Sequence, residues 1–325
     1  MSFDCLVGRP IGRTGVAVTR LGFGAAEMGG VYEPVEEGVA RAAAERAWEM
    51  GIRYFDVAPL YGCGLAETRL GAVLRGHARE EYVLSTKVGR LLRPDHDRRL
   101  ASYFDFSYDA VLRSLDESLQ RLGLDRVDIL FIHDPDEHWE EALRGAYPAL
   151  ERLRAEGVVR AIGAGMNQVP MLCQFARETE LDVFLLAGRY TLLDQEAYPE
   201  LLDLCLERRI SLVLGGVLNS GILADPRPGA HFNYEIANPQ WVDRAQQIAA
   251  VCRAHGVSLK EAAVQFPLAH PAITSLLAGS RRVDHLSEYP ALMEAAIPPA
   301  LWDDLRSEGL IPQTAPTPDG AETAR

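Results

Sequence analysis

Four side chains able to move or steer a proton follow three consecutive apolar runs of the chain. Asp56 and Tyr61 follow the first run, Lys87 ends the second, and His133 ends the third. A free tyrosine titrates near ~10, too high for ready proton exchange at neutral pH. A lysine ammonium favours the phenolate, so we expect Lys87 to lower the pKa of Tyr61 while Asp56 keeps Lys87 charged and oriented. His133 is placed to hydrogen-bond the reacting oxygen or to relay the proton.

Taken one at a time, these residues have ordinary interpretations. An aspartate near a proline is usually a turn residue, a lysine at a strand end is usually solvated, and a lone histidine usually belongs to the core or the surface. Their value as a catalytic set depends on whether the chain brings the ends of the apolar runs together, because proton transfer needs the groups within hydrogen-bond reach.

The rest of the chain repeats the same unit, a short apolar run followed by an amphipathic stretch. The predicted strands are 20–24, 54–58, 82–87, 127–133, 159–165, 183–188, 211–216 and 274–279. The predicted helices are 39–49, 65–74, 108–121, 140–154, 169–177, 198–208, 258–268 and 284–295, with Ser107 and Ser258 as N-caps. Eight strand–helix pairs predict a closed (β/α)8 barrel, in which the carboxyl ends of all strands meet at one mouth.

Several segments lie outside the eightfold count. Residues 6–18 predict an N-terminal β-hairpin, and 91–106 and 219–239 predict long loops on the face where such barrels do their chemistry. An extra helix is expected over 241–255. Residues 1–311 are expected to form a single barrel domain, followed by a flexible tail over 312–325.

Composition excludes several classes of protein. Apolar residues make up 48% and charged residues 24% of the 325 positions, which is a globular composition and not a disordered one. With 33 basic and 46 acidic residues the net charge is −13, which disfavours nucleic acid and anionic lipid as partners. Five scattered cysteines predict neither a disulfide framework nor a zinc site. No apolar run is long enough to span a bilayer, and the start has no export signal. We therefore expect a cytoplasmic protein, monomeric or a small homo-oligomer, with a small-molecule substrate and no metal.

The motifs around the four chemical residues resemble those of the aldo-keto reductase family. Asp56 with Tyr61 five residues later, Ser-Thr-Lys87 and Ile-His133-Asp-Pro form the signature, and the likeness extends over nearly the whole chain. The resemblance implies a barrel that binds NAD(P) without a Rossmann domain. It also implies hydride transfer between nicotinamide C4 and a carbonyl or hemiacetal carbon, with Tyr61 as general acid/base, Lys87 and Asp56 as its tuning pair and His133 orienting the substrate.

One branch of the family is more similar than the rest. The segments 163–167, 187–195 and 215–221 look like those of the D-threo-aldose 1-dehydrogenase group, to which L-fucose dehydrogenases and pyridoxal 4-dehydrogenase are similar. The implied reaction is oxidation of an aldose of the L-fucose, L-galactose or D-arabinose type at C1 to the aldonolactone. The alternatives are pyridoxal oxidation at C4, a carbonyl reductase, or a nucleotide-binding regulatory subunit on the same fold.

The resemblance also implies cofactor contacts, with departures. Many relatives stack the nicotinamide on an aromatic residue where this chain has Gly215 and Gly216, and Met166 and Asn167 stand where Ser-Asn is usual. Lys and Arg residues that bind the 2′-phosphate of NADP correspond here to Gly279 and His285, so NAD is expected to be preferred, with NADP possible. The expected cofactor-binding residues are Asn167, Gly215, Gly216, Leu218, Gly279, Ser280, Arg281 and His285.

A sugar needs polar groups for its hydroxyls and an apolar surface for one ring face. Besides Tyr61 and His133, the residues expected to supply these contacts from the loops after the strands are Arg189, Asn219 and Tyr103.

Overall fold

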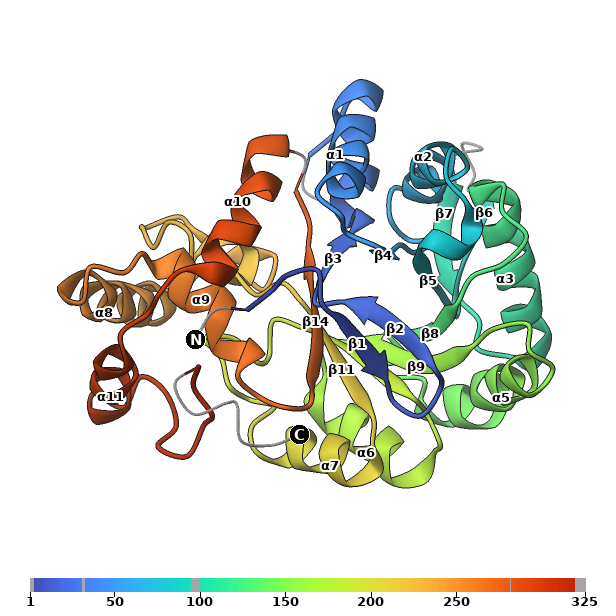
Figure 1. The fold of residues 1–325 in the computed structure, drawn as a ribbon. Helices are drawn as coiled ribbons and strands as arrows, with labels where there is room; N and C mark the ends of the chain where they lie inside the picture. Colours follow the sequence, from blue (N-terminus) through green and yellow to red (C-terminus); the bar gives the residue numbers. More distant parts are fainter. Residues whose placement is uncertain (1–2, 31–32, 95–99, 281, 319–325) are drawn as a thin grey trace.

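The computed structural model describes residues 3–30, 33–94, 100–280 and 282–318, and its centre is a closed barrel of eight parallel strands (Figure 1). In the order in which they neighbour one another, the strands are β3 (Leu21–Gly24), β4 (Tyr54–Asp56), β5 (Val83–Val88), β8 (Ile129–His133), β9 (Ala161–Met166), β10 (Val183–Ala187), β11 (Ser211–Gly215) and β14 (Ile273–Ala278). Most of these strands are buried along their whole length, as expected for a parallel sheet covered on both faces. The predicted (β/α)8 barrel is confirmed.

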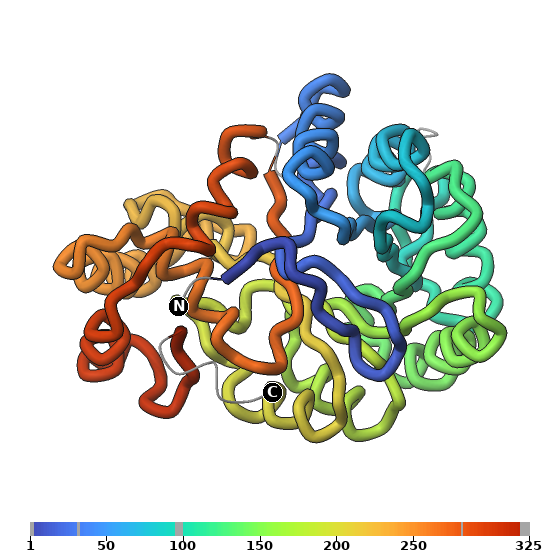
Figure 2. Tube along the Cα trace, in the orientation of Figure 1, coloured from blue at the N-terminus to red at the C-terminus, as the bar shows by residue number. Residues whose placement is uncertain are grey.

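Helices form the outer ring of the molecule (Figures 1 and 2). They are α1 (Glu37–Glu49), α2 (Leu65–Leu74), α3 (Tyr108–Leu122), α5 (Tyr147–Ala155), α6 (Val169–Glu178), α7 (Glu200–Arg208), α8 (Pro239–Ala254), α9 (Leu259–Leu268), α10 (Val283–Glu294) and α11 (Pro299–Ser307). Ser258 caps α9 in a capping box with Glu261. Ser107 stands at the N-cap of α3 but its hydroxyl bonds Asp105 instead, 2.7 Å away.

The helix predicted over 140–154 is interrupted. It begins as α4 (Trp139–Glu141), continues as one π-helical segment, η3 (Ala142–Ala146), and becomes α-helical again in α5. Pro148 has no N–H to donate, and the amide of Tyr147 bonds the Ala142 carbonyl five residues back. A Cβ at Gly145 would lie 2.4 Å from the Phe106 carbonyl oxygen, so the segment also packs unusually close to the chain before α3.

The amino-terminal end of the barrel is closed by the predicted hairpin. Strands β1 (Gly8–Ile11) and β2 (Val16–Thr19) pair antiparallel and lie across this end (Figure 1). Ile11, Val16 and Val18 are fully buried and join the side chains inside the barrel, including Tyr54 and Phe131, in one apolar cluster. The barrel is therefore open only at its other end.

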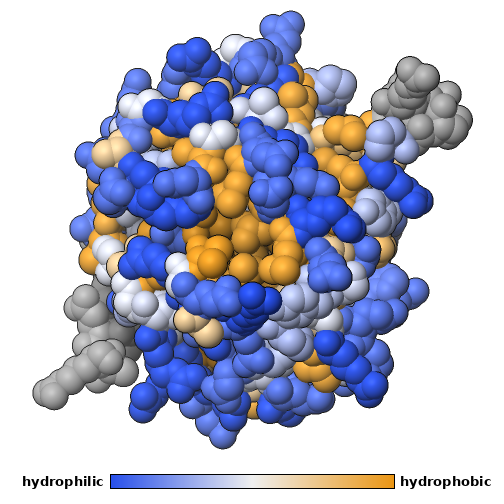
Figure 3. Space-filling view, turned by 90° about the vertical axis from the view of Figure 1, so that its right-hand side faces the viewer, coloured by the Kyte–Doolittle hydropathy of each residue, from blue (hydrophilic) through white to orange (hydrophobic). Residues whose placement is uncertain are grey.

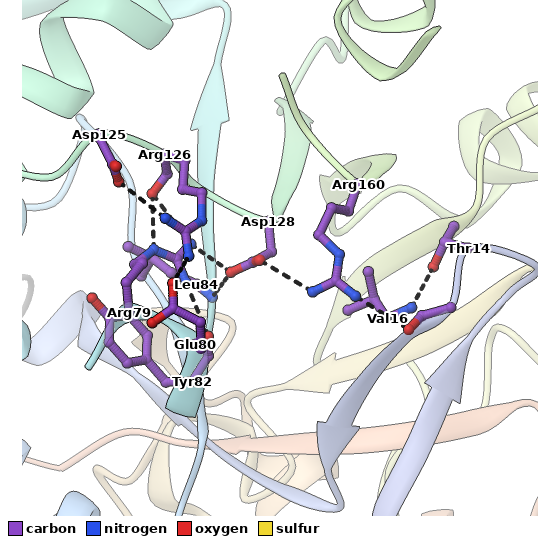
Figure 4. Close-up of polar contacts among 11 residues, drawn as sticks. Thr14, Val16, Arg79, Glu80, Tyr82, Leu84, Asp125, Arg126, Asp128 and Arg160 are labelled. Carbon is purple, nitrogen blue, oxygen red and sulfur yellow. Dashed lines mark hydrogen bonds and ion pairs between the residues drawn. The ribbon is translucent and has the colours of Figure 1, made fainter. Parts of the chain in front are cut away.

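Two buried aspartates tie neighbouring strands together at this closed end. The backbone amide of Asp128, just before β8, donates to the Leu84 carbonyl of β5 at 2.8 Å. The Asp128 carboxylate in turn accepts from the Leu84 amide at 2.9 Å and from the Arg79 guanidinium at 2.6 Å (Figure 4). Asp182, just before β10, makes the equivalent contacts with β9: its amide donates to the Ile162 carbonyl, and its carboxylate accepts from the Ile162 amide and from the Arg154 guanidinium. These contacts stabilise the base of the barrel and lie away from the mouth.

The long loops after the strands carry short hairpins over the mouth. β6 (Arg90–Pro94) pairs with β7 (Leu100–Phe104) within the loop expected over 91–106, and β12 (His231–Phe232) pairs with β13 (Glu235–Ile236) within the loop over 219–239. The extra helix predicted over 241–255 is α8, packed through Trp241 on Phe232 at a ring distance of 4.3 Å.

The first part of the expected flexible tail is packed. Ala315 and Thr317 are buried, and Arg306 of α11 donates to the Ala315 carbonyl and to the Thr317 hydroxyl. Residues 319–325 lie outside the described part of the chain.

The outer surface is mainly polar. The face made by the helices on the right of Figure 1 is mostly hydrophilic around one central apolar patch (Figure 3). Among the described residues, no helix is both long enough and apolar enough to cross a membrane.

Candidate active site

Tyr61 lies on the turn between β4 and α2, held by two glycines. Its amide bonds the Ala58 carbonyl at 3.1 Å, and its carbonyl accepts from Ala66 in the first turn of α2. The segment η1 (Ala25–Gly29) presses on this turn, because a Cβ on Gly29 would lie 2.4 Å from the Tyr61 carbonyl carbon and a Cβ on Gly62 2.4 Å from the Gly29 oxygen. Only glycine fits at these two contacts, so the backbone that carries Tyr61 is fixed in position.

Lys87 and Asp56 form an ion pair beside Tyr61. The ammonium lies 2.6 Å from the Asp56 carboxylate and 3.0 Å from the Val57 carbonyl, and both charged side chains are almost fully buried. The other carboxylate oxygen accepts from Ser85, which is also 3.2 Å from the Tyr54 hydroxyl. The Lys87 ammonium sits 4.9 Å from the centre of the Tyr61 ring. The predicted tuning pair is thus brought together with Tyr61.

His133 completes the group at the end of β8. Its ring stands nearly perpendicular to that of Tyr61, with centroids 6.0 Å apart. The side chain is buried, and among the described residues its Nδ1 atom has no hydrogen-bond partner. A buried polar atom without a partner is uncommon in a folded protein, and here it fits a site that takes its missing partner from a bound molecule.

The pKa of Tyr61 does not move in the expected direction. Burial raises it well above its usual value, and the carboxylates of Asp56 and Asp134 raise it further, while the Arg90 guanidinium opposes them. The shift is therefore opposite to the one expected, because desolvation of the phenolate and the nearby carboxylates outweigh the cation that opposes them, which is Arg90. Tyr61 is a neutral phenol at neutral pH.

His133 is also neutral. Burial lowers its pKa well below the usual value, and the cations Lys87 and Arg90 lower it further. The reacting oxygen of a bound molecule would therefore face two neutral hydrogen-bonding groups, with one buried ammonium behind them. Such a site can supply a proton to, or take one from, an oxygen without placing a free charge next to it.

A second ion pair at the mouth was not predicted from the sequence. The Arg90 guanidinium, at the base of the β6–β7 hairpin, lies 2.6 Å from the Asp134 carboxylate, and the same carboxylate oxygen is 3.5 Å from His133 Nε2. Asp134 is the aspartate of the Ile-His133-Asp-Pro motif, and the sequence analysis assigns it no function. Its position directly after a strand end, as an ionisable side chain, is the feature of the sequence that could have pointed to it.

The expected carboxamide contact, Asn167, lies at the end of β9. Its amide nitrogen donates to the Ala187 carbonyl at 2.9 Å, and its side chain is hydrogen-bonded to Tyr234. Gly215 ends β11 and Gly216 follows it; a Cβ at either position would have no neighbour within 3.5 Å, so neither glycine is required by close packing. Leu218 follows, partly buried against the core.

The expected phosphate contacts follow β14. Gly279 and His285 are exposed, and the Ser280 hydroxyl accepts from the Arg282 amide at 3.0 Å. The Arg282 guanidinium pairs with Asp284 at 2.5 Å, and this contact lowers the Asp284 pKa to about 2. Arg281 lies outside the described residues.

Two of the expected substrate-binding residues, Arg189 and Asn219, already have partners within the protein. Arg189 lines a cavity of about 360 Å³ together with Asn167, but its guanidinium already pairs with Asp194 and Glu196. Asn219 is buried, with both amide atoms used by the Gly188 carbonyl and the Thr191 hydroxyl. It therefore shapes the loop after β11, and its expected contact with a substrate stays a prediction.

Tyr103 is on the β6–β7 hairpin, with the Arg93 guanidinium 4.8 Å from its ring centre. It pairs with Leu91 in this hairpin and does not lie on a barrel strand, so its expected contact with a substrate stays a prediction.

A further unpredicted feature is the tip of the β12–β13 hairpin. Asn233 and Tyr234 both have left-handed backbone, with φ of 52° and 69°. A two-residue turn of this kind normally carries glycine second, so Tyr234 is strained. Arg189 bonds the Asn233 side chain at 2.6 Å, and Ser220 accepts the Tyr234 amide at 3.1 Å. The hairpin is thereby fastened across the mouth near Tyr61.

Comparison with known proteins gives a consistent result. Residues 20–307 match the model of the Aldo/keto reductase family. The chain is 43% identical to a D-threo-aldose 1-dehydrogenase from Pseudomonas sp, over 92% of this chain and 96% of the relative. It is 41% identical to a pyridoxal 4-dehydrogenase from Microbacterium luteolum, over 93% and 97%. It is 32% identical to an L-galactose dehydrogenase from Arabidopsis thaliana, over 86% of each chain.

Solved structures agree on the fold. A holo-form aldo-keto reductase from Bacillus halodurans superposes with a TM-score of 0.77 and 24% identity, covering 94% of this chain and 96% of that one. A glycerol dehydrogenase from Gluconobacter oxydans gives a TM-score of 0.73 at 18% identity, covering 94% and 97%.

Proposed function

The chain belongs to the aldo/keto reductase family, and on that basis we propose that it oxidises a free aldose at C1 to the aldonolactone, with NAD(P)⁺ as hydride acceptor. The observation that carries the proposal is the assembly of Tyr61, Lys87, Asp56 and His133 at the mouth of the barrel. The similarity to a D-threo-aldose 1-dehydrogenase over nearly the full length of both proteins supports an aldose as the substrate.

The residues present fit a nicotinamide nucleotide. The mouth offers an open stretch at Gly215 and Gly216, an unpartnered Nδ1 on His133, and the amide side chain of Asn167 beside them. Gly279 and Ser280, at the turn into α10, are the candidates for holding its phosphates through their backbone amides. When bound in oxidised form, the nicotinamide accepts the hydride from C1 and brings a positive charge that favours the phenolate of a nearby tyrosine.

The chain's own residues handle the proton. In this proposal Tyr61 has lost its proton to water before the step, because the positive charge of the bound cofactor favours the phenolate. Its Oη atom then takes the proton of the anomeric hydroxyl as the C1–H bond breaks and the C1=O bond of the lactone forms. Because His133 is neutral, it holds the same oxygen by a hydrogen bond without competing as an acid. Lys87, kept charged by Asp56 at 2.6 Å, stabilises the phenolate while it exists.

NAD is the preferred cofactor in this proposal. The charged carboxylate of Asp284 stands at the start of α10 and already occupies Arg282. A 2′-phosphate placed there would meet a negative charge and a neutralised arginine, so NADP is expected to bind more weakly.

A second candidate function is oxidation of pyridoxal at C4. The specific observation in its favour is the 41% identity to a pyridoxal 4-dehydrogenase over 93% of this chain. The same proton and hydride steps would act on the cyclic hemiacetal of pyridoxal.

The test is a set of initial rates of NAD⁺ and NADP⁺ reduction with L-fucose, L-galactose, D-arabinose, pyridoxal and a simple aliphatic alcohol. The proposal expects turnover of one or more aldoses, faster with NAD⁺. Tyr61→Phe should lose on the order of 10²–10⁴-fold in rate while binding NADH as the wild type does. Tyr147→Phe, the same change on α5 where the hydroxyl bonds Glu151, is the matched control. Turnover of pyridoxal alone would move the assignment to the second candidate.

A further inference from the structure

We propose that Asp134, held by Arg90, selects polyhydroxylated substrates by accepting a hydrogen bond from a substrate hydroxyl next to the reacting carbon. This inference rests on the proposed function and adds to it the residue that reads the sugar. The Arg90–Asp134 pair is not needed for the proton step, which Tyr61, Lys87, Asp56 and His133 carry out.

Asp134 is fixed against the catalytic group by its backbone. It follows His133 directly, and its amide donates to the Gly165 carbonyl of β9 at 3.0 Å. Its φ is 44°, in the left-handed region that residues other than glycine seldom adopt. Strained backbone of this kind persists where the surrounding structure enforces it, often at ligand sites.

The carboxylate has one oxygen engaged and one available. Oδ2 receives the Arg90 guanidinium at 2.6 Å and lies 3.5 Å from His133 Nε2. For Oδ1, no hydrogen bond is found within the described part of the chain, and the side chain is 20% exposed. An available carboxylate oxygen therefore stands at the mouth, one residue from the histidine that orients the reacting oxygen.

The two ion pairs of the mouth differ in exposure. The Lys87–Asp56 pair is 1% and 2% exposed, whereas the Arg90–Asp134 pair is 22% and 20% exposed. Of these two pairs, the outer one is therefore the pair whose side chains are accessible to a molecule bound at the mouth. Arg90 is itself steadied by Phe104, whose ring centre is 4.8 Å from the guanidinium carbon. Arg90 is a positioning residue in this scheme.

A hydroxyl contact of this type discriminates strongly. A hydrogen bond to a charged acceptor is among the stronger ones in proteins, and a site built for a hydroxyl leaves its own polar group unpaired when the hydroxyl is missing. An aldose carries a hydroxyl on C2, the carbon next to C1, whereas a simple aliphatic alcohol has no hydroxyl next to its reacting carbon.

The experiment compares each monodeoxy analogue of the best aldose, at C2, C3 and C4, with the parent sugar. The measured quantity is the ratio of kcat/KM for the parent to that for the analogue, in wild type and in Asp134→Asn. Because one sugar pair is used for both enzymes, differences in intrinsic reactivity between the sugars cancel. We expect the ratio for the C2 analogue, which lacks the hydroxyl next to the reacting carbon, to be 10-fold or more in the wild type and to fall to about 3-fold or less in Asp134→Asn. The ratios for the C3 and C4 analogues should be the same in the two enzymes.

Two further variants support the comparison. Asp136→Asn makes the same change two residues away, at an exposed position, and should keep the wild-type ratios. Arg90→Gln releases Asp134 without altering it and should also lower the ratio, so the inference can be tested even if Asp134→Asn does not fold.

The outcomes are distinct. A wild type that oxidises aldoses, with the same deoxy ratios in Asp134→Asn and Arg90→Gln, overturns this inference and leaves the proposed function standing. A uniform loss of kcat for every substrate and analogue also overturns it, because Asp134 would then act only through His133. A wild type that oxidises no aldose refutes the proposed function and this inference with it.

Discussion

Replacing Lys87 by methionine should destabilise the protein far more than the small change in side-chain volume suggests. The Lys87 ammonium is 2.6 Å from Asp56, with the two side chains 1% and 2% exposed. Without its partner, the Asp56 carboxylate remains buried with only the Ser85 hydroxyl to stabilise it. Removing one member of a buried ion pair costs about 3–5 kcal/mol of unfolding free energy. For a chain of this length that corresponds to a fall of roughly 4–7 °C in Tm.

The double variant Asp56→Asn/Lys87→Met separates stability from catalysis. It removes both charges together, so most of the lost unfolding free energy should return, to within about 1–2 kcal/mol of wild type. Catalysis should not return, because no cation remains to stabilise the Tyr61 phenolate. The assay is chemical denaturation at pH 7 for all three proteins, combined with turnover of the best substrate.

A control and two contrary results complete this test. Arg41→Met breaks an exposed pair with Glu45, also at 2.6 Å, and should leave the unfolding free energy close to that of the wild type. If Lys87→Met is as stable as Arg41→Met, or if the double variant is no more stable than Lys87→Met, the buried pair is not what the reasoning assumes.

Three more predictions concern other parts of the fold. Asp128→Ala, which leaves Arg79 without this partner, should lower the unfolding free energy by about 3–5 kcal/mol without changing turnover per folded molecule. The control Asp125→Ala, at an exposed position, should not lower the unfolding free energy. Thermal melts measure the stability and initial rates measure the turnover. Burial lowers the His270 pKa from 6.5 to about 4, so folding favours its neutral form and stability is lost as pH falls from 6.5 towards 4. Denaturation at pH 7 and pH 4.5 should show a loss of roughly 2–3 kcal/mol of unfolding free energy from this residue, and the loss should be absent in His270→Gln. Tyr234→Gly should relieve its left-handed backbone, leaving Tm equal or higher, yet raise KM; a clear fall in Tm would show that the tyrosine ring contributes more than the strain costs.

Much of the scaffold could be predicted from local pattern. The eight strands were placed to within a few residues because continuous apolar runs are what a doubly covered parallel strand requires. The catalytic group followed from the same pattern, since strand ends converge in a barrel. The π-helical segment before α5 was missed because the cue, Pro148, lies inside an otherwise regular helical pattern.

The contacts at the mouth could not be predicted in the same way. The engagement of Asn219 by Gly188 and Thr191 joins residues 28 and 31 positions apart in two loops. The fastening of Tyr234 to Ser220 and the balance of burial against charge at Tyr61 depend on how those loops fold over the barrel. Such loop geometry is not set by periodicity or by spacing. The sequence therefore indicates which residue types lie near the mouth, but not which hydrogen bonds and ion pairs their side chains form.

The closed amino-terminal end restricts how the site can exchange protons. From Lys87 a hydrogen-bonded chain runs through Asp56 and Ser85 to Tyr54, away from the mouth. It ends there, because Tyr54 is fully buried above Ile11 and Val16 and its pKa is raised well above the usual value. These hydrogen bonds therefore do not provide a route by which a proton could pass from the site to the solvent. In the proposed reaction, a proton taken up by Tyr61 would therefore leave through the same opening as the product, and the protonation of Tyr61 would be reset only while the mouth is open to water.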